Sequence, residues 1–157
     1  MKTTKILSLL VMLFVSVLGF AQGQPVHFSV QQKQVSPTEV DVIFSATIDK
    51  GWHVYSTGLP ADGPISATVT TEKAVGAEPI GKLIASGHEK NVFDPVFSMK
   101  LRYFENKVTF IQKYKITGKT YHIKGFLEYG SCDDEQCMPP TDVEFDYKGN
   151  GPATAPT

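Results

Sequence analysis

The sequence predicts an all-β fold, a single immunoglobulin-like antiparallel β-sandwich. Several short segments alternate apolar and polar residues with a period of two, and they are rich in β-branched and aromatic side chains. Turn residues separate these segments, and no segment beyond residue 21 keeps the i, i+3, i+4, i+7 apolar spacing of a helix. Without an N-terminal leader, roughly 136 residues remain, which is enough for one domain with a proper core.

The N-terminus predicts an export signal. Two lysines precede an apolar run from Ile6 to Phe20, and small residues around Ala21 suit a signal peptidase. The run is about 15 residues long, shorter than the roughly 20 that a membrane-spanning helix needs. We therefore expect residues 1–21 to be a signal peptide. The mature chain, starting near Gln22, is expected outside the cytosol, where disulfides persist, and without membrane insertion.

Four segments carry the clearest strand pattern, at 40–48, 107–116, 121–129 and 143–147. In each, alternate residues form an apolar face, as in a strand that is buried on one side. The faces are Val40, Val42, Phe44, Ala46 and Ile48; Val108, Phe110, Tyr114 and Ile116; Tyr121, Ile123, Gly125, Leu127 and Tyr129; and Val143, Phe145 and Tyr147.

Two turns are predicted between these strands. Glu105-Asn106 is the first, and Thr117-Gly118-Lys119 supplies a glycine for a positive φ between two strong strand patterns. The second turn predicts a hairpin in which 107–116 pairs directly with 120–129. Several strands at this spacing in one domain favour a sandwich.

The C-terminal part divides into a last strand and a tail. We expect the strand at 141–147 to follow a cysteine-containing turn directly, so that the globular domain covers 22–147. Residues 148–157 hold glycine, proline and small polar residues without a large apolar side chain. We expect this tail to be disordered.

Charge argues against two classes of partner. Without the two N-terminal lysines the chain has 13 basic and 16 acidic side chains, a net charge of −3. Arg102 is the only arginine, and no basic cluster is present. Because arginine does most base reading and much phosphate binding, we expect no nucleic-acid partner. A membrane-surface role also lacks its basic amphipathic stretch.

The only two cysteines, Cys132 and Cys137, lie in Tyr129-Gly-Ser-Cys-Asp-Asp-Glu-Gln-Cys-Met-Pro-Pro140. A disulfide between them would close a loop of about six residues and stabilise the fold by only about 2 kcal/mol. A pair in a short loop suits thiol–disulfide exchange, in which one sulfur is attacked and the other resolves the mixed disulfide. This favours a redox couple, and a structural bridge remains the alternative.

Metal binding is a further alternative. Thiols, methionines and histidines are ligands that hold Cu(I), so a copper chaperone or another non-catalytic binding module stays open. However, no histidine lies near the thiols in sequence, and no second cysteine pair completes a zinc set. His53 lies within a strand pattern and is interpreted as a surface or half-buried polar residue. We expect no metal and no other cofactor.

Three carboxylates, in Asp133-Asp134-Glu135, separate the cysteines. Negative charges disfavour a thiolate beside them. A reduced pair in this turn should therefore be a slow nucleophile, suited to a relay that reacts only inside a matched complex. The same charges would steer a basic partner surface toward the turn.

Three segments resemble one family. Tyr129-Gly-Ser-Cys132 through Cys137-Met-Pro-Pro-Thr141 resembles the active segment of the N-terminal periplasmic domain of the thiol:disulfide interchange protein DsbD. Gly51-Trp-His-Val-Tyr55 resembles the family's Gly-aromatic-aromatic-Leu-Tyr strand, and His88-Glu89 followed by Phe93 resembles its cap loop. The resemblance spans roughly residues 25–147.

The resemblance implies an immunoglobulin-like domain that relays electrons in the periplasm by thiol:disulfide interchange, an oxidoreductase-type activity. A membrane-embedded DsbD-type donor would reduce the pair, which would then reduce thioredoxin-like periplasmic proteins. By position, Cys137 forms the mixed disulfide with partners and Cys132 resolves it. Phe93 is the implied cap that shields the disulfide, with Tyr55 and Tyr129 as its neighbours.

The sequence also departs from the family pattern. Four residues separate the cysteines, where the best-known members have five, and His53 stands in place of the first strand tyrosine. Met138 replaces an aromatic residue after the second cysteine, and Phe97 competes with Phe93 as the cap. The family's transmembrane and thioredoxin-like parts do not follow in this sequence. We therefore expect a stand-alone relay served by a separate membrane partner, with a related binding domain as the alternative.

Overall fold

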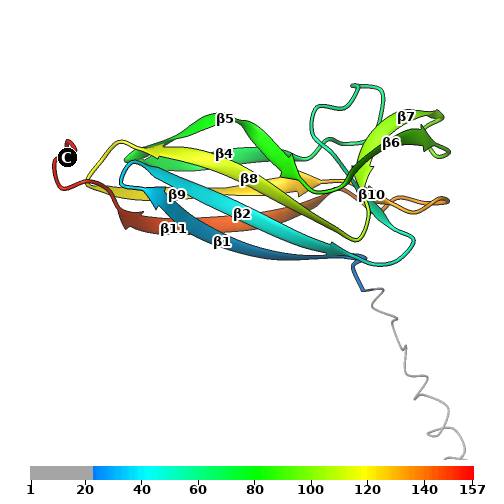
Figure 1. Ribbon diagram of the computed structural model, residues 1–157, viewed down its shortest axis with the longest axis horizontal. Helices are drawn as coiled ribbons and strands as arrows, with labels where there is room; N and C mark the ends of the chain where they lie inside the picture. Colours follow the sequence, from blue (N-terminus) through cyan, green and yellow to red (C-terminus); the bar gives the residue numbers. More distant parts are fainter. Residues whose placement is uncertain (1–22) are drawn as a thin grey trace, which may run out of the picture.

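The computed structural model describes residues 23–157, which form an all-β structure (Figure 1). The expected signal peptide, 1–21, lies outside the described residues. Nothing in 23–157 is helical, so this part of the chain contains no membrane-spanning helix. The strands are β1 (Val26–Ser36), β2 (Glu39–Ile48), β3 (His53–Tyr55), β4 (Thr68–Val75), β5 (Ala77–Ser86), β6 (Glu89–Asp94), β7 (Met99–Phe104), β8 (Lys107–Ile116), β9 (Thr120–Tyr129), β10 (Ser131–Cys132) and β11 (Thr141–Asn150).

Two antiparallel sheets form the sandwich. One has the strand order β1-β2-β8-β5 and the other the order β11-β9-β4. Aromatic rings join them across the core: the ring of Phe145 on β11 lies 5.8 Å from that of Phe44 on β2 and 6.2 Å from that of Tyr114 on β8. The hydroxyls of Tyr114 and Thr71 on β4 are 2.7 Å apart. The predicted all-β sandwich is confirmed.

The strand faces predicted from periodicity are the faces that the core buries. The alternating residues of β2, β8 and β9 are buried, and Phe145 is the buried residue of the last strand. Each large apolar side chain buried here contributes about 1.5–3 kcal/mol. Gly125 breaks the apolar series of β9 for a steric reason, because a Cβ there would collide with the carbonyl oxygen of Thr70 on β4.

The predicted hairpin between β8 and β9 is wrong. The two strands are consecutive but lie in different sheets: β8 pairs with β2 and β5, and β9 pairs with β4 and β11. The backbone N–H groups of Thr117 and Gly118 donate to the carbonyl of Gly76, which lies between β4 and β5. Both strands are apolar on one face, and burying both faces in one core sets them opposite each other rather than side by side.

The last strand is longer than the sequence indicated. β11 follows the cysteine turn at Thr141, as expected, but it continues through Asn150, which pairs with Thr120. The N–H of Gly151 then donates to the carbonyl of Lys119 at 2.7 Å. Residues 148–150 of the expected tail therefore belong to the sheet, because backbone pairing requires no apolar side chain.

A third, smaller sheet carries the cysteine turn. Its strand order is β10-β3-β7-β6, and it lies at one end of the sandwich, at the right of Figure 1. The short strand β3 is its centre: Val54 pairs with Ser131 on one side and with Phe104 on the other. This sheet brings together segments that are far apart in sequence.

Candidate redox site

Cys132 and Cys137 form a disulfide, with their Cα atoms 4.0 Å apart. The two halves of the disulfide differ in exposure. Cys132 ends β10 and is only 2% exposed, whereas Cys137 is exposed on the returning side of the turn. The N–H of Met138 donates to the carbonyl of Ser131 at 2.9 Å, which ties the chain after the second cysteine to β10.

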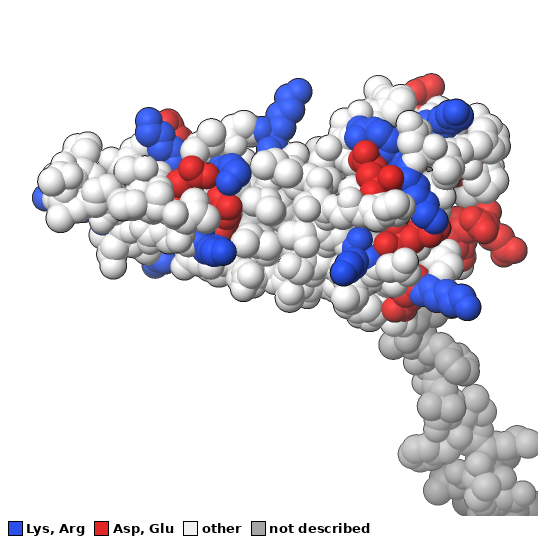
Figure 2. Space-filling view, in the orientation of Figure 1, with Lys and Arg blue, Asp and Glu red and all other residues white. Residues whose placement is uncertain are grey.

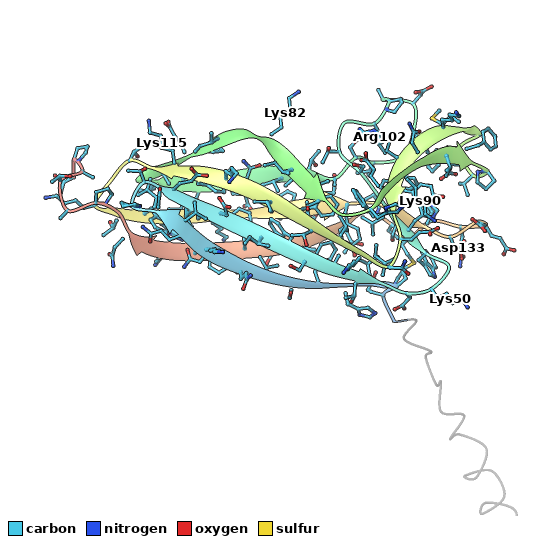
Figure 3. The ribbon with its side chains drawn as sticks, viewed as in Figure 1. Lys50, Lys82, Lys90, Arg102, Lys115 and Asp133 are labelled. Carbon is cyan, nitrogen blue, oxygen red and sulfur yellow. A yellow bond between two sulfur atoms is a disulfide. The ribbon has the colours of Figure 1, made fainter. Side chains whose placement is uncertain are left out.

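The acidic turn between the cysteines is organised by one of its own carboxylates. Asp133 Oδ1 accepts hydrogen bonds from the N–H groups of Glu135 at 2.8 Å and Gln136 at 2.7 Å. These donors hold the pKa of the Asp133 carboxyl below its usual range. Asp134 and Glu135 are exposed to solvent. Figure 3 labels Asp133 in this loop, and Figure 2 shows acidic side chains at that end of the molecule.

An apolar surface adjoins the disulfide. Cys132 packs in a small buried cluster with Tyr55 and Leu101, against which Phe97 and Met99 are partly buried. Beside it a hollow of about 260 Å³ opens to the surface. Its lining includes both cysteines together with Ile65, Phe97, Met138 and Pro140. The disulfide therefore forms part of the wall of a mainly apolar hollow.

Of the three aromatic residues that the sequence assigned to the site, the structure brings only Tyr55 to the disulfide. Its ring is fully buried in the cluster of Cys132. Phe93 lies on β6, the edge strand of the small sheet, where it is 62% exposed and does not line the hollow. Phe97, the competing residue, occupies that place: it lines the hollow, and its ring meets that of Tyr55 edge-on at 6.0 Å.

Tyr129 lies in the main core rather than beside the sulfurs. Its ring packs against that of Phe28 on β1 at 4.8 Å, and burial raises the pKa of its hydroxyl. Its contribution to the site is through the backbone. β9 continues through Gly130, whose carbonyl accepts the N–H of Tyr55 at 3.1 Å, into the strand that ends at Cys132.

Sequence reasoning missed a buried polar cluster next to the disulfide, formed by His53, Tyr55 and Asp94. These residues are 5%, 0% and 1% exposed. The Tyr55 hydroxyl donates to Asp94 Oδ2 and lies 3.0 Å from His53 Nε2. Burial lowers the pKa of His53, an effect that the nearby Asp94 carboxylate opposes. Burial and the bond to Asp94 raise the pKa of Tyr55 far above its usual value.

One sequence signal could have suggested this cluster. His53 and Tyr55 are two residues apart in a strand, so their side chains share a face. Because Tyr55 is buried, His53 is buried on the same face, and the interpretation of His53 as a surface or half-buried residue is wrong. Asp94 gave only the signal of an Asp-Pro turn, which does not show that its carboxylate points inward.

Among residues 23–157, no group of three or more His, Cys, Asp or Glu side chains is arranged to hold a metal ion. Both thiols are engaged in the disulfide. What the arrangement offers chemically is an asymmetric disulfide between an exposed cysteine, Cys137, and a buried one, Cys132, beside an apolar hollow.

Comparison with known proteins agrees with this geometry. Residues 21–148 match the family described as thiol:disulfide interchange protein DsbD, N-terminal. The N-terminal periplasmic domain of ScsB from Proteus mirabilis has a similar fold, with a TM-score of 0.58 and 13% identity over 82% of this chain and 48% of that one. This chain thus spans about half the length of the ScsB structure.

Two further structures show lower structural similarity. The reduced DsbD N-terminal domain of Neisseria meningitidis is 28% identical over 79% of this chain and 86% of that one, with a TM-score of 0.46. The GAE domain of yeast GGA1 is 7% identical over 82% of this chain and 96% of that one, with a TM-score of 0.42. No curated protein sequence matches.

Fold and site together define an all-β domain that carries an asymmetric, surface-accessible disulfide. Because the family match covers most of the sequence, the chain belongs to the family of DsbD N-terminal domains. Family membership and the disulfide support a general role in thiol–disulfide exchange.

Proposed function

We propose that this protein is an exported thiol–disulfide relay that acts in the periplasm through Cys132 and Cys137. Its electrons come from a membrane-embedded donor of DsbD type and go to thioredoxin-like periplasmic proteins. The observation that carries the proposal is the unequal exposure of the two cysteines, since Cys132 is buried and Cys137 is exposed. A structural disulfide does not need a cysteine beside an open apolar hollow, whereas a disulfide that reacts with a partner protein does.

The exchange starts at the exposed sulfur. A donor thiolate attacks Cys137 Sγ, a mixed disulfide forms, and Cys132 leaves as a thiolate that takes up a proton. The donor's second thiol then attacks the donor sulfur of the mixed disulfide. This step forms the donor's disulfide and releases Cys137 as the second thiol. Toward the acceptor the steps reverse: Cys137 attacks the acceptor disulfide, and Cys132 resolves the mixed disulfide. Each cycle moves two electrons and two protons.

The surroundings of the sulfurs suit selective docking. The hollow offers an apolar surface for a partner side chain next to Cys137, and Phe97 is the proposed cap that a partner displaces. Asp134 and Glu135 at the exposed tip would attract a basic rim on the partner. These features favour reaction inside a protein complex over reaction with small thiols.

Trapping with single cysteine variants tests the relay. In Cys132→Ser the resolving thiol is absent, so a mixed disulfide through Cys137 should accumulate when the reduced variant meets an oxidised thioredoxin-like protein. Cys137→Ser should give no such complex. Non-reducing electrophoresis and mass spectrometry of the cross-linked peptide identify the bonded sulfur.

Other outcomes would change the assignment. Trapping through Cys132 alone would reverse the roles of the two cysteines. Trapping by neither variant would overturn the relay and favour a structural bridge or a non-catalytic binding module.

A further inference from the structure

The turn that carries Phe97 is held by a buried carboxylate. Asp94, the last residue of β6, is 1% exposed, and its Oδ1 accepts the N–H groups of Val96 at 2.9 Å and Phe97 at 3.2 Å. The turn ends at Ser98, whose φ of 54° lies in the left-handed region that non-glycine residues rarely adopt. The turn therefore depends on these side-chain bonds for its conformation.

The second oxygen of the same carboxylate faces the strand beside the disulfide. Asp94 Oδ2 accepts the hydroxyl of Tyr55 and lies 3.5 Å from His53 Nε2. His53 is directly opposite Cys132 in the β3–β10 pairing, and its ring also packs 4.3 Å from that of Tyr103. One side chain thus joins the Phe97 turn to the strand that positions the buried sulfur.

We propose that Asp94 is a positioning residue for exchange at the disulfide: it anchors the 95–98 turn to Tyr55 and so keeps Phe97 in the wall of the hollow beside the disulfide. The inference rests on the proposed function and deepens it by assigning the element that controls access.

The physical reason lies in the cost of opening. When the whole turn moves Phe97 away from the hollow, it takes its two N–H donors away from Asp94 Oδ1. A buried carboxylate that loses donors carries an uncompensated charge, which is strongly unfavourable. The closed position of Phe97 is therefore favoured by bonds that Phe97 makes through its backbone, in addition to its ring contact with Tyr55.

The test measures reduction of the disulfide in the whole mature protein by dithiothreitol, which needs no protein partner. Asp94→Asn removes the charge, and Phe97→Ala removes the shield itself. Asp94→Asn should raise the second-order rate constant by roughly tenfold, the scale of a hydrogen bond to a charged group. Phe97→Ala should raise it by at least as much. If Asp94 acts through Phe97, the double variant should react no faster than Phe97→Ala alone.

Asp146→Asn is the matched control. It removes the charge from another His–Asp contact, between Asp146 Oδ1 on β11 and His122 Nε2 on β9 at 2.7 Å, away from the disulfide. Its reduction rate should equal that of the unchanged protein. An unchanged reduction rate in Asp94→Asn would overturn the assignment. So would a double variant whose rate increase is the product of the increases in the two single variants.

A second variant covers the case in which Asp94→Asn does not fold. Tyr55→Phe keeps the ring against Phe97 and removes only the hydroxyl that Asp94 binds. It should also speed reduction, and again not in the Phe97→Ala background; an unchanged rate would overturn the proposal. The rate of reduction by dithiothreitol does not depend on any protein partner. If partner trapping fails, the relay is refuted, but the test of Asp94 keeps its own outcome.

Discussion

Removing the disulfide should leave the domain folded. The change is Cys132→Ala together with Cys137→Ala. Cys132 belongs to the small cluster with Tyr55 and Leu101, whereas the main core fills the space between the two large sheets and contains neither cysteine. The fold therefore has its principal source of stability elsewhere.

The size of the loss follows from two contributions. The cysteines are five positions apart, and cross-linking so short a loop stabilises the fold by about 2 kcal/mol through the chain entropy of the unfolded state. Removing the buried sulfur of Cys132 costs on the order of 1 kcal/mol more in lost packing. We expect the free energy of unfolding to fall by about 3 kcal/mol in the double variant. Reduced, unmodified protein should lose only the first part.

Equilibrium unfolding in urea, followed by circular dichroism, gives these values for the oxidised, reduced and double-alanine proteins. With slopes of about 1–3 kcal/mol per molar urea, the midpoint of the double variant should fall by roughly 1–3 M. A double variant that is unfolded without urea, or a loss above roughly 5 kcal/mol, would refute this reasoning and make the disulfide a structural bridge.

Three further outcomes are expected. Phe97→Ala should speed reduction by dithiothreitol, whereas Phe93→Ala, which removes an exposed ring, should not. The reverse result would make Phe93 on β6 the cap. Burial lowers the pKa of His53 below 6.5, so the unfolded chain binds its proton more tightly and stability should fall as pH drops through and below 6.5. Unfolding curves at several pH values should show this loss, and His53→Phe should reduce it. Asp134→Asn with Glu135→Gln should slow association with a basic thioredoxin-like partner at low salt and matter little at high salt, as stopped-flow rates would show.

Periodicity alone identified the buried faces of the strongest strands, because alternation with a period of two is a local property. Val42 and Phe44 in β2, and Ile123 and Leu127 in β9, point inward wherever their strands pair. The partners of these strands were not predictable in the same way. The turn at Gly118 indicated a hairpin, but local turn chemistry does not show whether a chain returns beside its neighbour or crosses to the opposite sheet.

The sequence by itself determined the reactive pair. Cys132 and Cys137 are the only cysteines and lie five positions apart, so the sequence already identified them as a pair, and the structure shows that they form a disulfide. The acidic composition of the turn between them is likewise a local fact. Only the tertiary structure decided which sulfur is exposed and which phenylalanine, Phe97 rather than Phe93, lies beside it.

The tertiary structure alone also brought Asp94 to Tyr55, across 39 positions of sequence. The physical reason is that a single strand specifies the direction of its own side chains, whereas contacts between strands depend on pairing and on the packing of sheets. Those long-range contacts form only when the whole core is buried at once.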